Sequence, residues 1–300
     1  MVILQQVVNG LALGGIYALI AIGWTTVFGV VGLINWTHGD IFMIGAYIGF
    51  FAIKDFGCGI FTALGLAMLL SGILAWLVDR LAYRPLRGAP RLALFITALG
   101  ASTFLRNMGL ILWEPHSRAY PEVVQTKVIN LVRWGQGTIT INSLHLLIII
   151  ASGLVMIGLQ LFITRTRVGK AMLAAAQDME ATELMGVEVG QLIGVTYFVS
   201  GLLGGAAGVL VGVLYAIDPL MGAMAGLKGW AVAVLGGVGS ITGAMVGGLL
   251  LGVAENIAGG LVIHGFSLSG YKDAIAFVIM IMTMLLKPNG LFGQKLEEKV

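Results

Sequence analysis

Long apolar runs alternate with short polar segments along the chain. The apolar stretches fall at roughly 7–30, 41–53, 58–78, 92–113, 143–164, 191–217, 229–263 and 273–286. Most are close to the ~20 apolar residues that an α-helix needs to cross the hydrocarbon core of a bilayer. The pattern therefore predicts an all-α fold: a polytopic membrane helical bundle of about eight spans, forming a single transmembrane domain over residues 1–300.

Three polar segments separate the spans. Segment 79–91 holds four arginines and one aspartate, 114–142 mixes charges with two prolines and Trp134, and 165–190 begins basic and then becomes acidic. Short loops rich in Lys and Arg stay on the cytoplasmic side of a membrane. We therefore predict a cytoplasmic 79–91 loop. Counting spans outward from it places 114–142 in the periplasm and 165–190 in the cytoplasm.

The lysine-bearing tail after Leu286 belongs in the cytoplasm by the same rule, but a single span over 229–263 would place it outside. That stretch is interrupted by the sequence Leu-Gly-Gly-Val-Gly-Ser at 235–240. A half-helix followed by a fuller helix restores a cytoplasmic tail, so we expect at least one broken or re-entrant helix. Non-helical backbone at membrane depth must be surrounded by protein or line a cavity. The translocation-path candidates at this break are Gly236, Gly237, Gly239 and Ser240.

A second polar junction lies between the first two apolar stretches. Asn35, His38 and Gly39 are path candidates there, although Asn and Gly are also common in turns and helix caps. The pattern G-x5-G-A occurs at 39–46 and again at 237–244. Paired glycine-interrupted segments in the two halves of a transporter mark candidate substrate paths, but a match this short is weak evidence alone.

Composition supports the membrane interpretation. Hydrophobic residues make up 58% of the chain and charged residues 10%, against about 25% charged residues in a soluble domain. This balance excludes a soluble globular protein. The net charge of +3 is too small to favour nucleic acid. The first charged residue is Asp40, so the N-terminus lacks the basic region of a signal peptide and is expected to be a retained span.

Small residues and scattered reactive groups complete this picture. The chain has 45 glycines, several at helical spacing, such as Gly10 with Gly14 and Gly248 with Gly252. Small residues four apart let helices approach closely in lipid, so we expect tight packing there. A single cysteine, Cys58, and four dispersed histidines predict no disulfide, no metal site and no cofactor.

A few charges interrupt the spans. Arg106 and Glu255 fall within apolar stretches, and a charge in a bilayer defaults to a paired or functional group. An ion pair between these two residues is one possibility. A proton-coupled or sodium-coupled secondary transporter would use Glu255 with Asn256 as its ion site. Asp218 and Lys272–Asp273 resemble anchors at the membrane surface.

The third polar segment is the most informative. Residues 170–185 are compatible with one surface helix that has an alanine-rich centre and charges around it. A surface helix between two spans suits docking onto a cytosolic partner, although an inert connector would look the same. The chain contains neither G-x4-G-K-[ST] nor H-E-x-x-H, so it is not expected to be an enzyme. If transport is driven by ATP, another polypeptide hydrolyses it.

Motifs along the whole chain resemble one transporter family. They are GLALGGIYALIAIG at 10–23, GLINWTHG at 32–39, AYRPLR at 82–87, GAMAGLK at 222–228, AVLGGVGSITGA at 233–244, YKDA at 271–274 and KPNGLFG at 287–293. In combination they are similar to the shorter permease subunit of high-affinity branched-chain amino acid ABC importers. The sequence departs from the family at Trp36-Thr37, often Phe-Ala there, and at Ile241-Thr242, often Ile-Pro.

The resemblance implies a docking segment. The stretch Glu180-Ala-Thr-x3-Gly186 resembles the E-A-A-x3-G loop of ABC importers, whose helix docks in a groove on the ATPase. The residues implied to form this coupling helix are Lys170, Ala174, Ala175, Glu180, Ala181, Thr182 and Gly186. The implied partners are a second permease in a heterodimer, two cytosolic ATPase subunits and a periplasmic substrate-binding protein that meets the 114–142 loop.

The expected function is therefore a multi-pass permease of the bacterial inner membrane. It would form the translocation path with the second permease for ATP-driven import of branched-chain amino acids. Such a path need not bind tightly, because the binding protein supplies the affinity, and no row of deep charges is expected. The alternatives are the same machine importing urea, short amides or other amino or aromatic acids, and an ion-coupled secondary transporter.

Overall fold

The computed structural model describes residues 2–121, 127–134, 137–263 and 266–293. Over this part of the chain, seven helices are long and apolar enough to cross a membrane, and the shorter α2 and α9 lie among them. The all-helical membrane bundle is therefore confirmed. The long helices are α1 (Val2–Val31), α3 (Ile60–Val78, continued by η1, Asp79–Tyr83, and η2, Arg84–Leu86), α4 (Arg91–Trp113), α5 (Ser143–Arg165), α8 (Val189–Leu214), α10 (Ile241–Gly259) and α11 (Lys272–Leu286, preceded by η3, Leu268–Tyr271).

Shorter elements connect these helices. Two of them lie within the bundle: α2 (Thr37–Lys54) and α9 (Met221–Gly236). The polar segment after α5 forms α6 (Arg167–Gln177) and α7 (Met179–Leu184). The strands are β1 (Val128–Trp134) with β2 (Gly137–Asn142), and β3 (Val262–Ile263) with β4 (Phe266–Ser267), each pair antiparallel.

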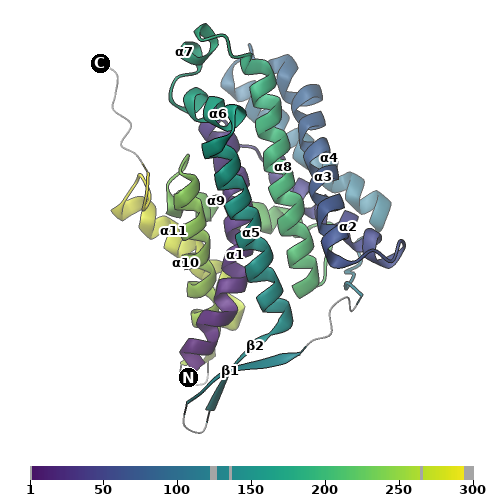
Figure 1. Cartoon of the computed structure of the whole chain (residues 1–300), viewed down its shortest axis with the longest axis vertical. Coiled ribbons are helices and arrows are strands. Elements are labelled where there is room, and N and C mark those ends of the chain that lie inside the picture. Colours follow the sequence, from purple (N-terminus) through teal and green to yellow (C-terminus); the bar gives the residue numbers. More distant parts are fainter. Residues whose placement is uncertain (1, 122–126, 135–136, 264–265, 294–300) are drawn as a thin grey trace.

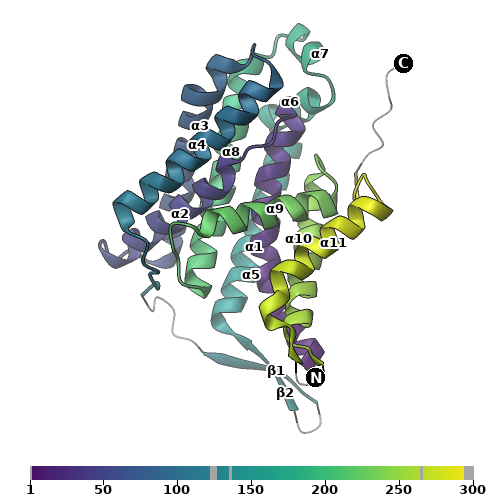
Figure 2. The same cartoon turned by 180° about the vertical axis from the view of Figure 1, so that it is seen from behind.

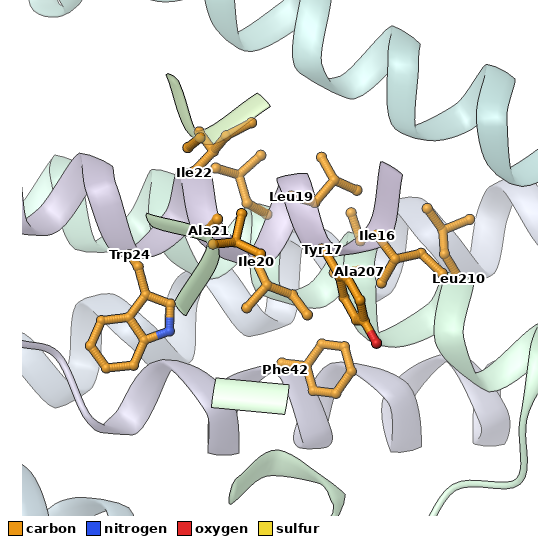
Figure 3. Packing of buried hydrophobic residues seen from close by; sticks show 14 of the residues in the cluster. Ile16, Tyr17, Leu19, Ile20, Ala21, Ile22, Trp24, Phe42, Ala207 and Leu210 are labelled. Carbon is orange, nitrogen blue, oxygen red and sulfur yellow. The ribbon is translucent and has the colours of Figure 1, made fainter. Parts of the chain in front are cut away.

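Helix α1 is the centre of the bundle. It packs against α10, α8, α9 and α5, and nearly all of its span is buried (Figure 1). Figure 3 shows Ile20 and Trp24 of α1 facing the same interior as Phe42 of α2, with Leu210 of α8 close by. Helix α1 is apolar on every side. This pattern is typical of a helix surrounded by other helices, which needs no polar face.

Glycines bring α1 and α10 into backbone contact. A methyl group on Gly10 would lie 2.6 Å from the Cα of Val253, and one on Gly14 would lie 2.8 Å from the Cα of Leu249. No side chain fits at such distances, so only glycine permits this approach. The close packing predicted from glycine spacing is confirmed for this pair of helices.

The polar segments gather at opposite ends of the molecule. Helices α6 and α7 lie at the end where α3 passes into α4, and the β1–β2 hairpin lies at the other end beside the start of α1 (Figure 1). Hydrogen bonds tie each group together. Arg87 donates to the carbonyl of Gly190 at 3.3 Å, and Gln5 donates to the carbonyl of Thr140 at 2.7 Å. The polar segments 79–91 and 165–190 therefore lie at the same end of the molecule, here named the coupling end.

The hairpin was not expected from the sequence. Strand β1 pairs with β2 from Val128 opposite Asn142 to Trp134 opposite Gly137. Asn142 then caps α5 by accepting a hydrogen bond from the amide of Leu144 at 3.1 Å. The side chain of Trp134 lies outside what the structure describes.

The predicted break within 229–263 is present. Helix α9 ends at Gly236, residues 237–240 form a turn, and α10 begins at Ile241 with Ser240 as its cap. The short helix before the break starts at Met221, earlier than the apolar pattern suggested, and lies across the bundle between α2 and α10 (Figure 2). Gly237 and Gly239 have φ of 106° and 90°, conformations that glycine adopts without strain.

The end of the chain closes this turn. The amides of Leu291 and Phe292 donate to the carbonyls of Leu235 and Gly236, both at 2.9 Å. These carbonyls belong to the last turn of α9, which has no partners of its own for them. The segment after α11 therefore caps α9.

The outer helices present apolar side chains outward. Ile111 of α4, Leu154 of α5 and Val278 of α11 are each more than half exposed. In water such a surface would be a liability, but in a bilayer it contacts lipid tails or another subunit. The surface therefore agrees with a membrane bundle.

Candidate functional site

The segment between α5 and α8 is built from two helices, not the single helix predicted over 170–185. Thr166 caps α6 by accepting from the amide of Gly169 at 3.0 Å, and Asp178 caps α7 by accepting from the amide of Ala181 at 3.0 Å. Asp178 has an extended backbone, which ends α6 before α7 begins. Asp at this position favours a new helix start over continuation, because its side chain satisfies the free amides.

A glycine ends α7. Gly186 has φ of 85°, its amide donates to Glu183 at 2.9 Å, and the amide of Val187 donates to Thr182 at 3.4 Å. This is the usual arrangement at a helix C-terminus that reverses through a left-handed residue. Gly186 therefore has a structural reason to be glycine, whatever it contacts in a complex.

The coupling-helix residues inferred from the sequence fall into two groups. Ala175 and Thr182 are buried against the rest of the molecule. The other five are exposed: Lys170, Ala174, Glu180, Ala181 and Gly186. At the end of α7, Leu184 is 89% exposed and Met185 is 84% exposed. Two large apolar side chains standing free at a polar end of the molecule are typical of a surface that another protein covers.

An ion pair connects this segment to the end of α3. One guanidinium nitrogen of Arg87, Nη2, lies 2.7 Å from both carboxylate oxygens of Asp79, while Nη1 donates to the carbonyl of Gly190 at 3.3 Å. Asp79 is buried, and Arg87 is only partly exposed. Hydrogen bonds between charged groups are stronger than neutral ones, and the two nitrogens of this arginine reach two different elements. The start of α8 and the end of α3 are thereby held together.

The path candidates near residue 35 form a buried network. Asn35 accepts hydrogen bonds from Thr37 at 2.6 Å and from Tyr83 at 3.1 Å, so it links the α1–α2 junction to η1. His38 is fully buried, with Nε2 at 3.1 Å from the carbonyl of Ile20 and Nδ1 at 3.1 Å from the hydroxyl of Ser200. His38 therefore joins α1, α2 and α8 in this conformation.

The other path candidates have neighbours that differ from those of His38. Gly39 lies against Gly222 of α9. Gly236 lies against Gly243 of α10, and Ser240 accepts a hydrogen bond from the amide of Gly243. Gly237 lies against Asn289 and Gly293, in the segment that follows α11. Gly239 has open space around its Cα. The two G-x5-G-A motifs thus occupy separate contacts, one at α2 and α9 and the other at α9 and α10.

Sequence reasoning singled out Glu255 but missed Lys228, its partner in the interior. The ammonium of Lys228 lies 3.0 Å from Glu255 Oε1 and 2.7 Å from Asp273 Oδ1, and the hydroxyl of Tyr17 donates to Glu255 at 2.7 Å. Lys228 and Glu255 are buried. The signal that could have revealed Lys228 was the cost of a lone lysine within a short apolar helix.

Two expectations about charge are wrong. Arg106 pairs with Asp40 at 3.3 Å, not with Glu255, because α4 packs on α2 whereas α10 packs on α1 and α9. Ser102 also donates to Asp40. The expected lack of deep charges is also incorrect, because Asp40, Lys228 and Glu255 are all buried in the interior. Each of these charges has a partner of opposite sign, Arg106 for Asp40 and Lys228 for Glu255, which is how a bundle accommodates them.

Comparisons with known proteins agree with this architecture. A family described as "Branched-chain amino acid transport system / permease component" matches residues 6–284. The high-affinity branched-chain amino acid transport system permease protein BraD of Pseudomonas aeruginosa is 40% identical, covering 99% of this chain and 98% of that protein. The corresponding protein LivH of Escherichia coli is 36% identical, covering 99% and 97%.

More distant matches extend the comparison. A probable branched-chain amino acid transport permease protein LivH of Methanocaldococcus jannaschii is 26% identical, covering 92% of this chain and 88% of that protein. A solved structure, PsaBC from Streptococcus pneumoniae in complex with Fab, has a TM-score of 0.49 at 12% identity, covering 95% and 92%. The family match and the full-length relatives agree with the motifs read from the sequence. This chain belongs to the family of branched-chain amino acid transport system permease components.

Proposed function

We propose that the chain is a permease subunit of an ATP-driven importer of branched-chain amino acids in the bacterial inner membrane. The observation that carries the proposal is the 40% identity to a branched-chain amino acid permease over 99% of the chain. The seven helices able to cross a membrane support a role as a translocation subunit. A second permease would complete the path, and a periplasmic binding protein would deliver the substrate.

The coupling end supports a site for the ATPase partners. The described residues of α6 and α7 combine exposed polar positions with the free side chains of Leu184 and Met185. An amphipathic helix whose apolar residues enter a groove on a partner is a recurring mode of recognition. We therefore assign docking to the exposed face of α6 and α7, with Ala175 and Thr182 holding that face in place.

The arrangement of polar segments supports an orientation. Segment 79–91, with four arginines, contacts segment 165–190 through Arg87 and Gly190. By the positive-inside rule, we propose that this end is cytoplasmic and that the β1–β2 hairpin faces the periplasm. The segment after α11 caps the end of α9, which lies across the bundle (Figure 2).

A mechanism follows from these connections. Closure of the ATPase dimer would displace α6 and α7, and the Asp79–Arg87–Gly190 contact would carry that motion to α3 and α8. The break between α9 and α10 and the α1–α2 junction would allow the inner helices to rearrange. In this scheme Asn35, His38 and Gly39, with Gly236, Gly237, Gly239 and Ser240, are proposed to border or regulate the path.

Reconstitution tests the function. The complex with its candidate ATPase subunits and binding protein, placed in proteoliposomes, is expected to take up leucine only with ATP. Competition with urea, acetamide and phenylalanine distinguishes the related cargo classes. Uptake that continues with ATPase-dead subunits and collapses with a proton uncoupler would instead identify an ion-coupled transporter.

Variants of α7 test docking. Glu180→Lys and Gly186→Pro are expected to abolish co-purification of the ATPase subunits while leaving membrane insertion intact. Proline cannot adopt the φ of 85° seen at Gly186, so this change disrupts the end of α7. Glu114→Lys, a charge reversal at the hairpin end, is the matched control. Normal ATPase association by both α7 variants would refute the docking role.

A further inference from the structure

A small cavity lies at the coupling end, between the end of α1 and the start of α4. Its volume is about 220 Å³, and η1 and α8 complete its wall. Pockets for drug-sized ligands are about 300–1,000 Å³, so this one suits a smaller molecule. It is separate from the His38 network, although Tyr83 borders both the cavity and Asn35.

The walls are mainly aliphatic and aromatic. Leu33 and Ile34 come from the α1–α2 junction, Leu94 and Phe95 from α4, and Phe28 from α1. Tyr83 and Tyr197 lie beside each other with ring centroids 5.3 Å apart. Branched aliphatic side chains are stabilised in such a setting by the removal of apolar surface from water.

The cavity is lined by one charged side chain and lies beside two helix ends. Arg91 lines the cavity and is the first residue of α4, so its guanidinium and the free amides of that helix start favour a carboxylate. Helix α1 ends at Val31, next to the lining residues Gly32 and Leu33, and the last carbonyls of a helix favour an ammonium group. Arg91 and this helix end are therefore suited to the two charges of a zwitterion.

The larger hollow on the molecule lacks these features. A groove of about 420 Å³ between α3, α5 and α8 is lined by apolar side chains such as Met68, Leu159 and Leu202. It offers no partner to either charge of an amino acid, and its chemistry suits hydrocarbon. The smaller cavity alone of these two combines apolar walls with a charged rim.

We propose that the cavity between α1 and α4 is a transient cargo site that holds a zwitterionic aliphatic amino acid just before release at the coupling end. This inference rests on the proposed function, because it assigns a place to the cargo of that importer. Arg91 binds the carboxylate, the end of α1 faces the ammonium group, and Phe95 sets the size limit for the side chain. The site is open to solvent at Gly32 and Arg91, which suits release rather than retention.

Photolabelling tests occupancy. The assembled transporter is illuminated with photo-leucine, a leucine analogue with a photoreactive diazirine in its side chain, and the labelled peptides are identified by mass spectrometry. Labels are expected on the peptides around Leu33 and Phe95 and are expected to disappear with excess leucine but not with excess urea. Labels spread over outward-facing residues such as Ile111, without competition, would overturn the proposal.

Two arginines provide a matched comparison. Arg91→Gln is expected to reduce competable labelling about tenfold, because one charge-assisted hydrogen bond to the carboxylate is lost. Arg80→Gln removes an exposed arginine that lies over Trp76 and does not line the cavity, so labelling should stay unchanged. Equal labelling in the two variants would contradict the role of Arg91.

A change in the preference between two cargo molecules cannot be produced by misfolding, which would reduce the uptake of both. Phe95 is 39% exposed, so Phe95→Ala is tolerable for folding and enlarges the cavity. Uptake of phenylalanine relative to leucine is expected to rise several-fold, roughly the discrimination that a few methylenes supply. If the wild-type complex takes up leucine with ATP while this ratio and the labelling do not respond, the cavity proposal fails and the proposed function stands. If the wild-type complex shows no ATP-driven uptake, both fail.

Discussion

Two ionic clusters in this protein differ in what they join. Lys228 and Glu255 lie inside the bundle, where they connect the short helix α9 to α10. Asp79 and Arg87 lie at the coupling end, where they connect the end of α3 to the start of α8. The first cluster adds an ion pair to helices that glycines already bring into close contact. The second can carry a displacement from the surface into the spans.

Burial separates the two clusters physically. Glu255 is 1% exposed and has no access to water if its partner is removed. Arg87 is a quarter exposed and can be hydrated when its partner is lost. Breaking a buried pair is costly mainly because it leaves one uncompensated charge, so the interior cluster should be the more sensitive of the two.

The largest effect is expected for Lys228→Met. It leaves Glu255 without its ammonium partner and should destabilise the protein by about 3–5 kcal/mol. Thermal unfolding of the purified protein in detergent measures the change. The double variant with Glu255→Met removes both charges and is the control, expected to regain most of the lost stability. A double variant no more stable than the single one would show that the pair does not behave as a buried ion pair.

An intermediate effect is expected for Asp79→Asn. The neutral amide keeps the shape of the side chain but removes the negative charge that faces Arg87. The expected cost is roughly 1–3 kcal/mol. The informative measurement is leucine transported per ATP hydrolysed, which should fall more than stability does, because the contact to α8 is weakened. Arg80→Gln serves as control on the same segment. Unchanged coupling in Asp79→Asn would remove the distinction between the two clusters.

The smallest effect is expected for Asp273→Asn. Asp273 contacts Lys228 at 2.7 Å, yet its side chain is 53% exposed. Exposed pairs contribute about 0–1 kcal/mol and weaken as salt rises. The unfolding temperature should therefore change slightly at low salt and converge with wild type at high salt. A loss comparable to that of Lys228→Met would show that Asp273 belongs to the buried part of the cluster.

Much of the fold was predictable because its signals are local. The spans follow from runs of apolar residues, and the break at 237–240 follows from glycines that no straight helix would concentrate there. Glycines four residues apart on α1 and on α10 predict that each helix packs closely, although not against which partner. Each of these features is encoded within about one helix length.

Features that depend on distant residues were not predictable. Lys228 and Glu255 are 27 positions apart on different helices, and nothing in a single sequence says which of several intramembrane charges will meet. The wrong pairing of Arg106 has the same cause. The split between α6 and α7 had a local signal, Asp178, that the alanine-rich pattern around it obscured. In the candidate site, the motif treats the coupling-helix residues as one group, whereas the structure buries Ala175 and Thr182 and exposes the others.

The cap on α9 has a consequence for how the protein is made. The partners of Leu235 and Gly236 are Leu291 and Phe292, which follow α10 and α11 in the sequence. Helix α9 must therefore wait in the membrane with open carbonyls while α10 and α11 are inserted. A chain that stopped just before Leu291 would therefore contain the same membrane-spanning helices and still have an uncapped α9.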